Sequence, residues 1–373
     1  MSPPRIVVCG AGAIGASVAW FLARRGAAPL VVDRARPGAA ASGKAAGFLA
    51  EDWSAGTPLD GLMRASFALH AEIAGTLGAE RIGHRPMDAL MTAAADEGSV
   101  EPYKRMESPD WLDGNVAVHE VIGDAATTAQ VNPYAFTTAL VEDAVAHGAT
   151  ARTGVVEGID LDPESGAVTG VVIDGAVEPA DAVVLALGPW TSQAQRWIAL
   201  PQVFGSRGAS VVLAADVPNQ VVFSEFLARD GQRSQLEIYP RPGGAVYVNG
   251  LSEHGALPDD PDEIAAIVAS GDELHRRAGV HSSALRDAEV IARGSCYRPL
   301  TVDGIPLIGP VPGVPGAYLA TAHASWGICN APATGRMVAE MILDGESHSL
   351  DAAPFALTRL PAGRMAVGEG RVG

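Results

Sequence analysis

A glycine-rich turn near the N-terminus constrains the fold more than any other feature of this sequence. Gly10, Gly12 and Gly15 follow a short apolar run and precede Ser17–Ala27, which has helical spacing. A strand, a glycine turn and a helix in this order direct backbone N–H groups and a helix N-terminus toward a pyrophosphate. The pattern therefore predicts a Rossmann-type domain that binds a dinucleotide, without deciding which dinucleotide.

The residues around this turn have separate predicted roles. Gly10 permits the tight turn, Gly12 lets the backbone approach a phosphate, and Gly15 lets the helix pack closely on the strand. A second strand, Leu30–Asp33, ends at a carboxylate near the spacing expected for a ribose ligand. The predicted cofactor site in this region comprises Gly10, Gly12, Ala13, Ile14, Gly15, Asp33 and Arg34.

Composition and charge narrow the class of protein. The 373 residues are 48% hydrophobic, enough for one large domain or two interleaved domains with a substantial core. The net charge of −17 argues against nucleic acid or an anionic membrane as a partner, because like charges repel. Because the first predicted strand begins at Arg5 or Ile6, no secretory signal peptide is expected. Three cysteines without metal-ligand or disulfide spacing predict no metal site and a cytoplasmic location.

Helical and strand-like segments alternate along the chain. Helical spacing predicts helices at Ala13–Arg25, Leu59–Leu77, Pro133–His147, Pro261–Ala278 and from about Ala331 to Leu343. Apolar or alternating runs predict strands at Arg5–Cys9, Leu30–Asp33, Val155–Leu161, Ala167–Ile173, Ala176–Glu178, Ala182–Leu187, Ser210–Ala214, Gln220–Phe226, Gln235–Tyr239, Ala245–Asn249 and Ala317–Thr321.

Two C-terminal blocks identify the dinucleotide. The first is CYRPLTVDGIPLIG (Cys296–Gly309), and the second, Tyr318–Gly345, contains HASWGICNAPATG. Both resemble the flavin-binding part of the D-amino-acid oxidase superfamily, in the branch that contains glycine oxidase and monomeric sarcosine oxidase. The resemblance spans nearly the whole chain. It implies FAD as cofactor and an α/β fold, in which a Rossmann-type FAD-binding domain interleaves with a β-rich α+β substrate-binding domain.

The alternation of segments predicts that the chain crosses between these two domains several times. The FAD-binding domain is expected to comprise residues 1–55, 130–207 and 285–345. The substrate-binding domain is expected to comprise residues 56–129 and 208–284, with a C-terminal tail at 346–373.

The resemblance assigns further residues to the cofactor site. The segment Ser42-Gly43-Lys44-Ala45-Ala46-Gly47 resembles the family's small-residue loop against phosphate and flavin, and a flexible surface loop is the alternative. Val156 matches the position whose backbone contacts the adenine, and Gly188 and Trp190 match the strand end beneath the cofactor. Amide groups of Gly327-Ile328-Cys329 would face the flavin from a helix N-terminus. The residues assigned in this way are Ser42, Gly43, Lys44, Ala46, Gly47, Val156, Gly188, Trp190, Gly327, Ile328 and Cys329.

Two further predictions concern covalent attachment of the flavin through Cys296 and the lysine that activates oxygen. In sarcosine oxidases a cysteine seven residues before the aspartate of a Thr-x-Asp motif is bonded to the flavin, and Cys296 precedes Asp303 by that spacing. Covalent FAD is therefore an expectation, with a buried bystander thiol as the alternative. Only two lysines occur, Lys44 and Lys104, so the later lysine that sarcosine oxidases use for oxygen activation has no counterpart.

The resemblance also predicts a substrate site. Arg298 matches the arginine that binds a substrate carboxylate through paired hydrogen bonds, with a structural salt bridge as the alternative. Glu237 and Tyr239 lie on one face of a strand, and Glu237 replaces a tyrosine that assists carboxylate binding in glycine oxidases. A glutamate there would repel a carboxylate unless it is protonated or paired, which suggests a cationic or larger amine, or a substrate with a hydrogen-bond donor on its far side. His323 and Trp326 are expected at the pocket wall, although packing roles are as plausible, and Ala322 occupies a position where glycine is common.

Together these features predict an FAD-dependent oxidation of the C–N bond of an amino acid or secondary amine. Hydride would pass to flavin N5, the imine would hydrolyse, and oxygen would yield hydrogen peroxide. The alternatives are a dehydrogenase with another electron acceptor and a non-catalytic flavin-binding regulatory protein. The expected partners are a small amine or amino acid and oxygen, and a homo-oligomer is compatible with the sequence.

Overall fold

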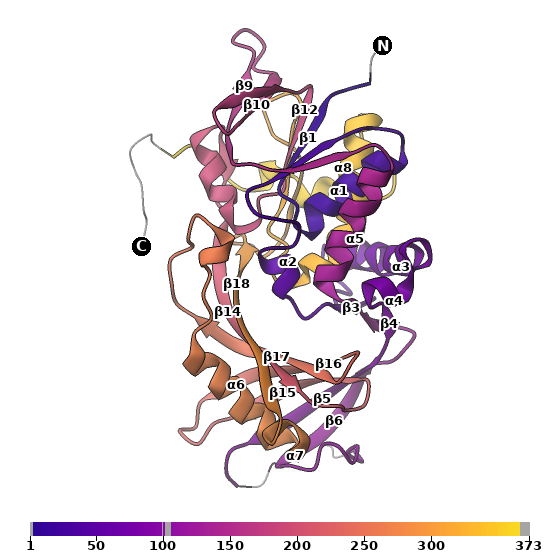
Figure 1. Cartoon of the computed structure of the whole chain (residues 1–373), viewed down its shortest axis with the longest axis vertical. Helices are drawn as coiled ribbons and strands as arrows, with labels where there is room; N and C mark the ends of the chain where they lie inside the picture. The colour runs from indigo at the N-terminus through magenta and orange to yellow at the C-terminus, as the bar shows by residue number, and fades with distance from the viewer. Residues whose placement is uncertain (1–2, 99, 101–105, 366–373) are drawn as a thin grey trace.

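The computed structural model describes residues 3–98, 100 and 106–365, and two parts of the molecule lie along its long axis (Figure 1). One part is built on a six-stranded sheet and the other on a seven-stranded sheet. Neither part is continuous in sequence, because the chain passes between them several times. The predicted fold class, a Rossmann-type domain interleaved with a β-rich domain, is confirmed.

The six-stranded sheet starts from the N-terminal strand. The apolar run Ile6–Cys9 forms β1, whose residues are all buried. Burial on both faces favours this continuous apolar pattern over alternation. The sheet order is β19 (Leu307–Pro310), β20 (Ala317–Thr321), β12 (Ala182–Leu185), β1, β2 (Leu30–Asp33) and β8 (Thr150–Thr153). Within this sheet, as the structure describes it, β19 and β20 pair in antiparallel fashion and the other neighbouring strands are parallel.

Different layers cover the two faces of this sheet. One face packs on α1 (Ala13–Arg24) and α8 (Gly327–Leu343), with α3 (Asp60–Leu77) against α8 and α5 (Pro133–Ala146) against α1. The other face packs on a meander of β9 (Val156–Leu161), β10 (Val168–Ile173) and β11 (Ala176–Pro179). The helices on one face of this sheet therefore come from distant parts of the chain.

The seven-stranded sheet forms the second part. Its order is β18 (Glu289–Leu300), β14 (Phe204–Ala214), β17 (Ala245–Glu253), β16 (Arg233–Arg241), β15 (Gln220–Leu227), β5 (Asp88–Ala95) and β6 (Val116–Gly123). On β16, Leu236 and Ile238 are buried in an apolar cluster with Leu274 of α6 (Val268–His281). Strand alternation turns Glu237 and Tyr239 to the opposite face, which looks toward the first sheet.

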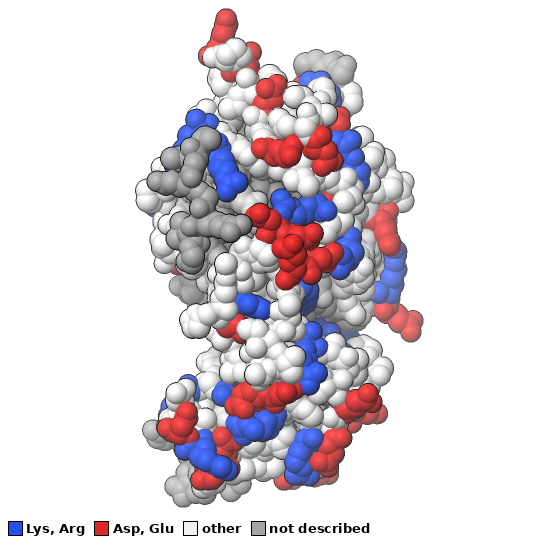
Figure 2. All heavy atoms as spheres, turned by 60° about the vertical axis from the view of Figure 1, so that its left-hand side comes forward, with Lys and Arg blue, Asp and Glu red and all other residues white. Residues whose placement is uncertain are grey.

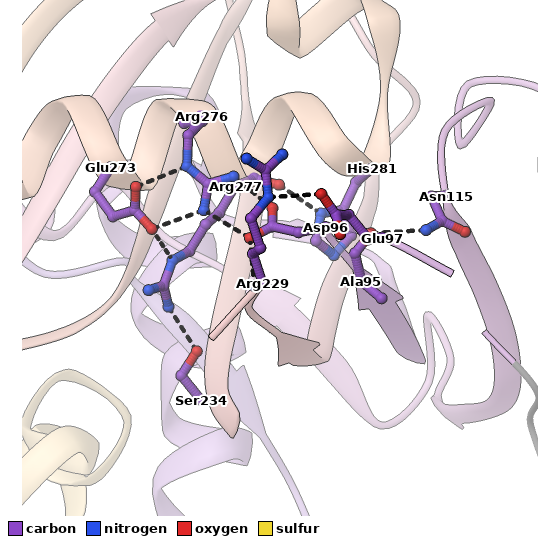
Figure 3. A network of polar contacts seen from close by, with 10 residues as sticks. All are labelled: Ala95, Asp96, Glu97, Asn115, Arg229, Ser234, Glu273, Arg276, Arg277 and His281. Carbon is purple, nitrogen blue, oxygen red and sulfur yellow. Dashed lines mark hydrogen bonds and ion pairs between the residues drawn. The ribbon is translucent and has the colours of Figure 1, made fainter. Parts of the chain in front are cut away.

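Polar contacts attach α6 to the sheet (Figure 3). The carboxylate of Glu273 accepts hydrogen bonds from Arg276 and Arg277, at 2.7 Å from each Nε. Arg277 Nη1 donates to Ser234 Oγ of β16 at 2.6 Å, and Arg276 pairs with Asp96, just beyond β5. These contacts hold the outer face of the sheet against its helix and leave the inner face to the site.

Shorter elements complete the structure. They are α2 (Ala41–Lys44), β3 (Phe48–Ala50), α4 (Ala79–Ile82), β4 (Arg85–Pro86), β7 (Thr128–Gln130), α7 (Ser283–Arg286), β13 (Leu200–Pro201), β21 (Ala362–Gly363) and the 3-10 helices Gly188–Arg196, Pro261–Glu263, Ala324–Trp326, Ala353–Phe355 and Leu357–Arg359. Acidic and basic side chains are interspersed over the face that Figure 2 presents. Among the described helices, none is both long and apolar enough to cross a membrane.

Two predicted helix boundaries are wrong. The helix expected from Pro261 starts at Val268, because the chain after a 3-10 turn is extended and the carbonyl of Ala265 accepts a hydrogen bond from Arg207. The helix expected from about Ala331 starts at Gly327 and continues through Pro332. The domain boundaries stay a prediction; β18, within the segment 285–345, pairs with β14 in the seven-stranded sheet.

Candidate functional site

A cavity of about 430 Å³ lies between the two sheets. One end is lined by the glycine turn after β1 and by the end of β2, and the other end by β16, β17 and β18. The ends of β12 and β20 and the start of α8 line the middle. The carboxyl ends of parallel strands are where ligands bind in open α/β sheets. The cavity therefore joins a dinucleotide-type site to the inner face of the second sheet.

The glycine turn brings three backbone segments close together. Gly10 has a φ of 106°, which favours glycine, and a Cβ there would lie 2.3 Å from the carbonyl oxygen of Ala186. A Cβ on Gly15 would lie 1.9 Å from the carbonyl oxygen of Gly10. A Cβ on Gly12 would lie 3.1 Å from Ser42 Oγ. Larger residues at Gly10 and Gly15 would push the turn away from β12 and α1.

Two side chains hold this turn in place. Asp33 accepts hydrogen bonds at Oδ2 from the N–H of Ala11 and at Oδ1 from the N–H of Ala35, at 2.8 and 2.9 Å. Ser42 Oγ accepts from the N–H of Ala13, the first residue of α1, at 2.9 Å. Asp33 and Ser42 also line the cavity. Their predicted contacts with ribose and phosphate stay predictions.

The start of α8 lies on the cavity wall although a proline interrupts its first turns. Pro332 has no N–H to donate to the carbonyl of Ile328. Nε2 of His70, from α3, lies 3.0 Å from that carbonyl oxygen and replaces the missing donor. Nε2 therefore carries a proton, and burial lowers the pKa of His70 to about 3, so the ring is neutral near neutral pH. Gly327 and Ile328 line the cavity at this end of the helix.

A second residue of α3 completes this support. Ser66, one helical turn before His70, accepts a hydrogen bond at Oγ from the N–H of Ala333 at 3.0 Å. His70 Nε2 is also 3.2 Å from the carbonyl oxygen of Cys329. Ser66 and His70 are both fully buried. α3 therefore satisfies the backbone groups that Pro332 disturbs and keeps the helix continuous up to the cavity.

The segment between β20 and α8 has an unusual backbone. The φ angles of Ala322 and Ala324 are 65° and 49°, in the left-handed region that favours glycine. Such conformations recur at ligand sites, where the surrounding structure stabilises them. His323 lies between them, is buried, and has its Nε2 2.9 Å from Thr334 Oγ1. Burial lowers the pKa of His323 to about 3, so this residue is uncharged near neutral pH.

Arg298 lies on the cavity wall without an anionic partner. Its Nη1 donates to Ser325 Oγ at 3.2 Å, and no carboxylate among the described residues lies within 4.0 Å of its guanidinium. The guanidinium packs over Gly208 of β14, where a Cβ would lie 3.1 Å from Nη2. Glycine at this position therefore leaves the guanidinium the room that it occupies. The predicted alternative, a structural salt bridge, is absent among the residues that the structure describes.

Glu237 and Tyr239 form a hydrogen-bonded pair on the same wall. The Tyr239 hydroxyl donates to Glu237 Oε2 at 2.6 Å. Burial, followed by the charge of Glu237, raises the pKa of Tyr239 well above its usual value, so the phenol stays protonated. Phe223 lies opposite Glu237 on the neighbouring strand β15, and its ring centroid is 5.8 Å from that of Tyr239. A carboxylate therefore lies beside aromatic rings at the substrate end.

Cys296 lies on β18, two residues before Arg298, and lines the cavity. Burial raises the pKa of its thiol, while the charges of Arg298 and Lys44 oppose that rise. Desolvation lowers the pKa of Lys44, whose carbonyl oxygen accepts a hydrogen bond from the Tyr247 hydroxyl at 2.9 Å. A covalent bond between Cys296 and FAD stays a prediction.

Most of the predicted site residues line this one cavity. These residues are Gly10, Gly12, Ala13, Ile14, Asp33, Arg34, Ser42, Ala46, Gly47, Val156, Gly188, Trp190, Glu237, Tyr239, Cys296, Arg298, His323, Trp326, Gly327 and Ile328. Four others, Gly15, Gly43, Lys44 and Cys329, are not among the lining residues. Gly15 and Gly43 pack against the carbonyls of Gly10 and Gly38, and the buried Cys329 thiol points to the carbonyl of Ala50.

Sequence reasoning missed several residues of the substrate end. Phe223, Tyr247 and Asn249 line the cavity from β15 and β17, and Phe48 does so from β3. Alternation along each strand assigns these residues to one face, but only the register between strands places them beside Glu237. Ser325 was also missed, and its contact with Arg298 spans 27 positions.

Comparison with known proteins identifies the family. A family model described as FAD dependent oxidoreductase, DAO, matches residues 5–341. The chain belongs to the DAO family. A putative oxidoreductase of Schizosaccharomyces pombe is 29% identical to this DAO-family protein over 379 residues, which cover 91% of the chain and 94% of the relative. A glycine oxidase of Geobacillus kaustophilus is 28% identical over 379 residues, covering 95% and 96% respectively.

Solved structures agree with this DAO-family assignment. The crystal structure of the glycine oxidase from Geobacillus kaustophilus superposes with a TM-score of 0.78 at 26% identity, over 96% of this chain and 99% of that one. The iminodiacetate oxidase of Chelativorans sp. BNC1 has the same fold, with a TM-score of 0.77 at 20% identity over 97% and 100%. The protein is therefore an FAD-dependent oxidoreductase of the glycine oxidase-like branch.

The residues of this DAO-family chain fit FAD. The cavity runs without interruption from the glycine turn, past Asp33 and Val156, to the start of α8 and the second sheet. Close backbone approach at Gly10 and Gly12 provides a narrow cradle of the kind that a pyrophosphate needs. Gly327 and Ile328, at the N-terminal end of α8, would face the part of FAD that becomes anionic on reduction.

Proposed function

We propose that this protein oxidises the C–N bond of an amino acid or secondary amine, giving an imine that hydrolyses, with oxygen as the final electron acceptor. The observation that carries the proposal is the Arg298 guanidinium, which lines the cavity with only a neutral hydrogen-bond partner among the described residues. Bound FAD would supply the hydride acceptor. The chain's contribution is to bind the carboxylate and to fix the α-carbon relative to the flavin.

The unpaired guanidinium favours a carboxylate substrate for a physical reason. A guanidinium presents parallel N–H donors that match a carboxylate, and these charge-assisted hydrogen bonds are the strongest that side chains form with such groups. Ser325 occupies Nη1, while Nη2 lies over Gly208 without a partner among the described hydrogen bonds. A carboxylate at this position would place the adjacent α-carbon within the cavity.

The first experiment is anaerobic mixing of the purified yellow protein with pools of amino acids, N-methyl amino acids and polyamines. The proposal expects one pool to bleach the absorbance of the oxidised flavin. Substituting Arg298→Leu should then raise KM for a carboxylate substrate about tenfold or more, since a charge-assisted contact contributes about 1.5–3 kcal/mol. An unchanged KM in this variant would show that Arg298 does not bind the substrate carboxylate.

The choice of electron acceptor has a separate test. After anaerobic reduction, admission of air should restore the yellow colour rapidly and produce one hydrogen peroxide for each substrate oxidised. Slow recovery in air, together with rapid recovery when a quinone is added, would assign the protein to the dehydrogenases instead.

A further inference from the structure

The inner face of the seven-stranded sheet presents two opposite charges that do not pair with each other. Arg298 lies on β18 and Glu237 on β16, with β14 and β17 between them. Both residues line the cavity, and neither forms a salt bridge among the described residues. A buried or half-buried charge without a partner is costly unless a ligand supplies the opposite charge. Two such charges on one wall indicate a ligand with two charged groups.

The carboxylate of Glu237 has room for one further hydrogen-bond donor. Its Oε2 accepts from the Tyr239 hydroxyl, and no described residue donates to Oε1. Tyr239 is 3% exposed, so its phenol is fixed by packing and holds the carboxylate in one orientation. Glu237 itself is half-buried and lines the cavity. The free oxygen is therefore available to a positively charged or N–H donor group of a ligand.

The rings of Phe223 and Tyr239 lie beside this carboxylate. Phe223 lies directly across from Glu237 in the register of β15 and β16, with ring centroids 5.8 Å from Tyr239 and 5.2 Å from Phe48. These three rings line the cavity. Aromatic faces attract cations through their quadrupole, and a carboxylate among such rings favours a desolvated ammonium or guanidinium over a neutral group.

We propose that Glu237, with Tyr239 and Phe223, binds a second, non-reacting cationic nitrogen at the far end of the substrate. This inference rests on the proposed function, with the substrate carboxylate on Arg298. The substrate class is then a basic α-amino acid or its N-alkyl derivative, whose side chain ends in an ammonium or guanidinium group.

The reacting amine itself does not fit the Glu237 position. Hydride transfer requires a neutral amine, whereas a neighbouring carboxylate stabilises the protonated amine and raises its pKa. Three strand spacings separate β18 from β16, roughly 14 Å between the backbones at about 4.8 Å each. The α-amine is only two bonds from the carboxylate on Arg298. A group several carbons beyond the α-carbon is needed to reach Glu237.

The test uses the FAD-loaded protein and pairs of substrates that differ in one charge. The pairs are lysine with norleucine and ornithine with norvaline, each as both enantiomers and as the N-methyl derivatives. One of these pairs is expected to reduce the flavin. Within that pair, the wild-type KM for the basic member should be at least tenfold lower than the KM for the neutral member. Glu237→Gln keeps an acceptor for Tyr239 but removes the charge. This variant should remove most of that preference through KM, with kcat changed less than threefold.

Glu289→Gln provides the matched control, because this exposed carboxylate lies on β18 and is not among the residues lining the cavity. It should leave the preference unchanged. Equal KM values for basic and neutral members in the wild type, or a preference that survives Glu237→Gln, would overturn the inference while the proposed amine oxidation stands. If no amine of any class reduces the flavin, the proposed function itself is wrong. Flavin reduction by a neutral amine therefore distinguishes failure of the inference about Glu237 from failure of the proposed function.

Discussion

The support of α8 by α3 leads to a prediction about stability that two buried serines can test. Ser66 Oγ accepts a hydrogen bond from the N–H of Ala333, the residue after Pro332. Ser66→Ala would leave that buried N–H without its partner. A buried donor that loses its acceptor costs about 1–3 kcal/mol in free energy of unfolding. Because the proline ring prevents regular closure of the helix at this point, neighbouring groups offer little compensation.

This free energy converts into a measurable shift in melting temperature. For 373 residues, an unfolding entropy of about 2.1 cal/mol/K per residue gives roughly 0.8 kcal/mol/K. The expected decrease in Tm for Ser66→Ala is therefore about 1–4 °C. The measurement is thermal unfolding of the FAD-loaded protein, followed by far-ultraviolet circular dichroism and by the fluorescence of released flavin.

Ser17 of α1 is the matched control. It is also fully buried, but its Oγ has no hydrogen-bond partner among the described residues. Ser17→Ala removes an unsatisfied hydroxyl and should leave Tm within about 1 °C of the wild type or raise it. Equal losses in the two variants would show that alanine at a buried serine position, rather than the hydrogen bond to Ala333, causes the effect. That result would refute the role assigned to Ser66.

Two further predictions concern pH and the flavin. Burial holds the pKa of His70 and His323 at about 3 and that of His281 at about 4, so the unfolded chain binds more protons below its own histidine pKa near 6.5. Stability should therefore fall as pH drops from about 6.5 toward 4, by roughly 2 kcal/mol at pH 5 for each of these three histidines. His70→Gln should make the loss of unfolding free energy between pH 7 and 5, measured by urea unfolding, smaller by roughly 2 kcal/mol, and an unchanged loss would contradict the assignment. If Cys296 is bonded to FAD, yellow colour should stay with acid-precipitated wild type and pass to the supernatant for Cys296→Ser, whereas colour released from the wild type excludes the bond.

The cofactor end of the molecule was predictable because its signals are local. The glycine turn, β1 and α1 are adjacent in sequence, and the contact that excludes a side chain at Gly15 is with the carbonyl of Gly10, within the turn itself. The neighbours of Gly10 and Gly12, Ala186 and Ser42, come from later segments, but the glycine pattern is readable without them. Asp33 follows at the end of the next strand, and its side chain accepts hydrogen bonds from the N–H groups of Ala11 and Ala35. Short-range packing and backbone geometry determine this part, so a single sequence contains the information.

The start of α8 shows where local signals fail. Helical spacing alone predicts a helix from about Ala331, and only the family resemblance places a helix N-terminus at Gly327-Ile328-Cys329. The helix begins at Gly327 and passes through Pro332, with hydrogen bonds from Ser66 and His70 of a helix more than 250 positions earlier. No local pattern contains that contact. The proline becomes compatible with the helix only when α3 is packed against it.

The substrate end depends on register in the same way. Alternation along β16 correctly assigns Glu237 and Tyr239 to one face, but the pairing with β15 is what brings Phe223 opposite Glu237. A shift of one residue in that pairing would turn Phe223 toward α6 and leave the carboxylate without its aromatic neighbour. The charge that Glu237 introduces is therefore readable from the sequence, whereas its surroundings are a property of the assembled sheet. The proposed substrate preference depends on the charge of Glu237 and on the aromatic surroundings that the strand register provides. Glu237→Gln removes the charge and leaves the register unchanged, so it measures the contribution of the charge separately.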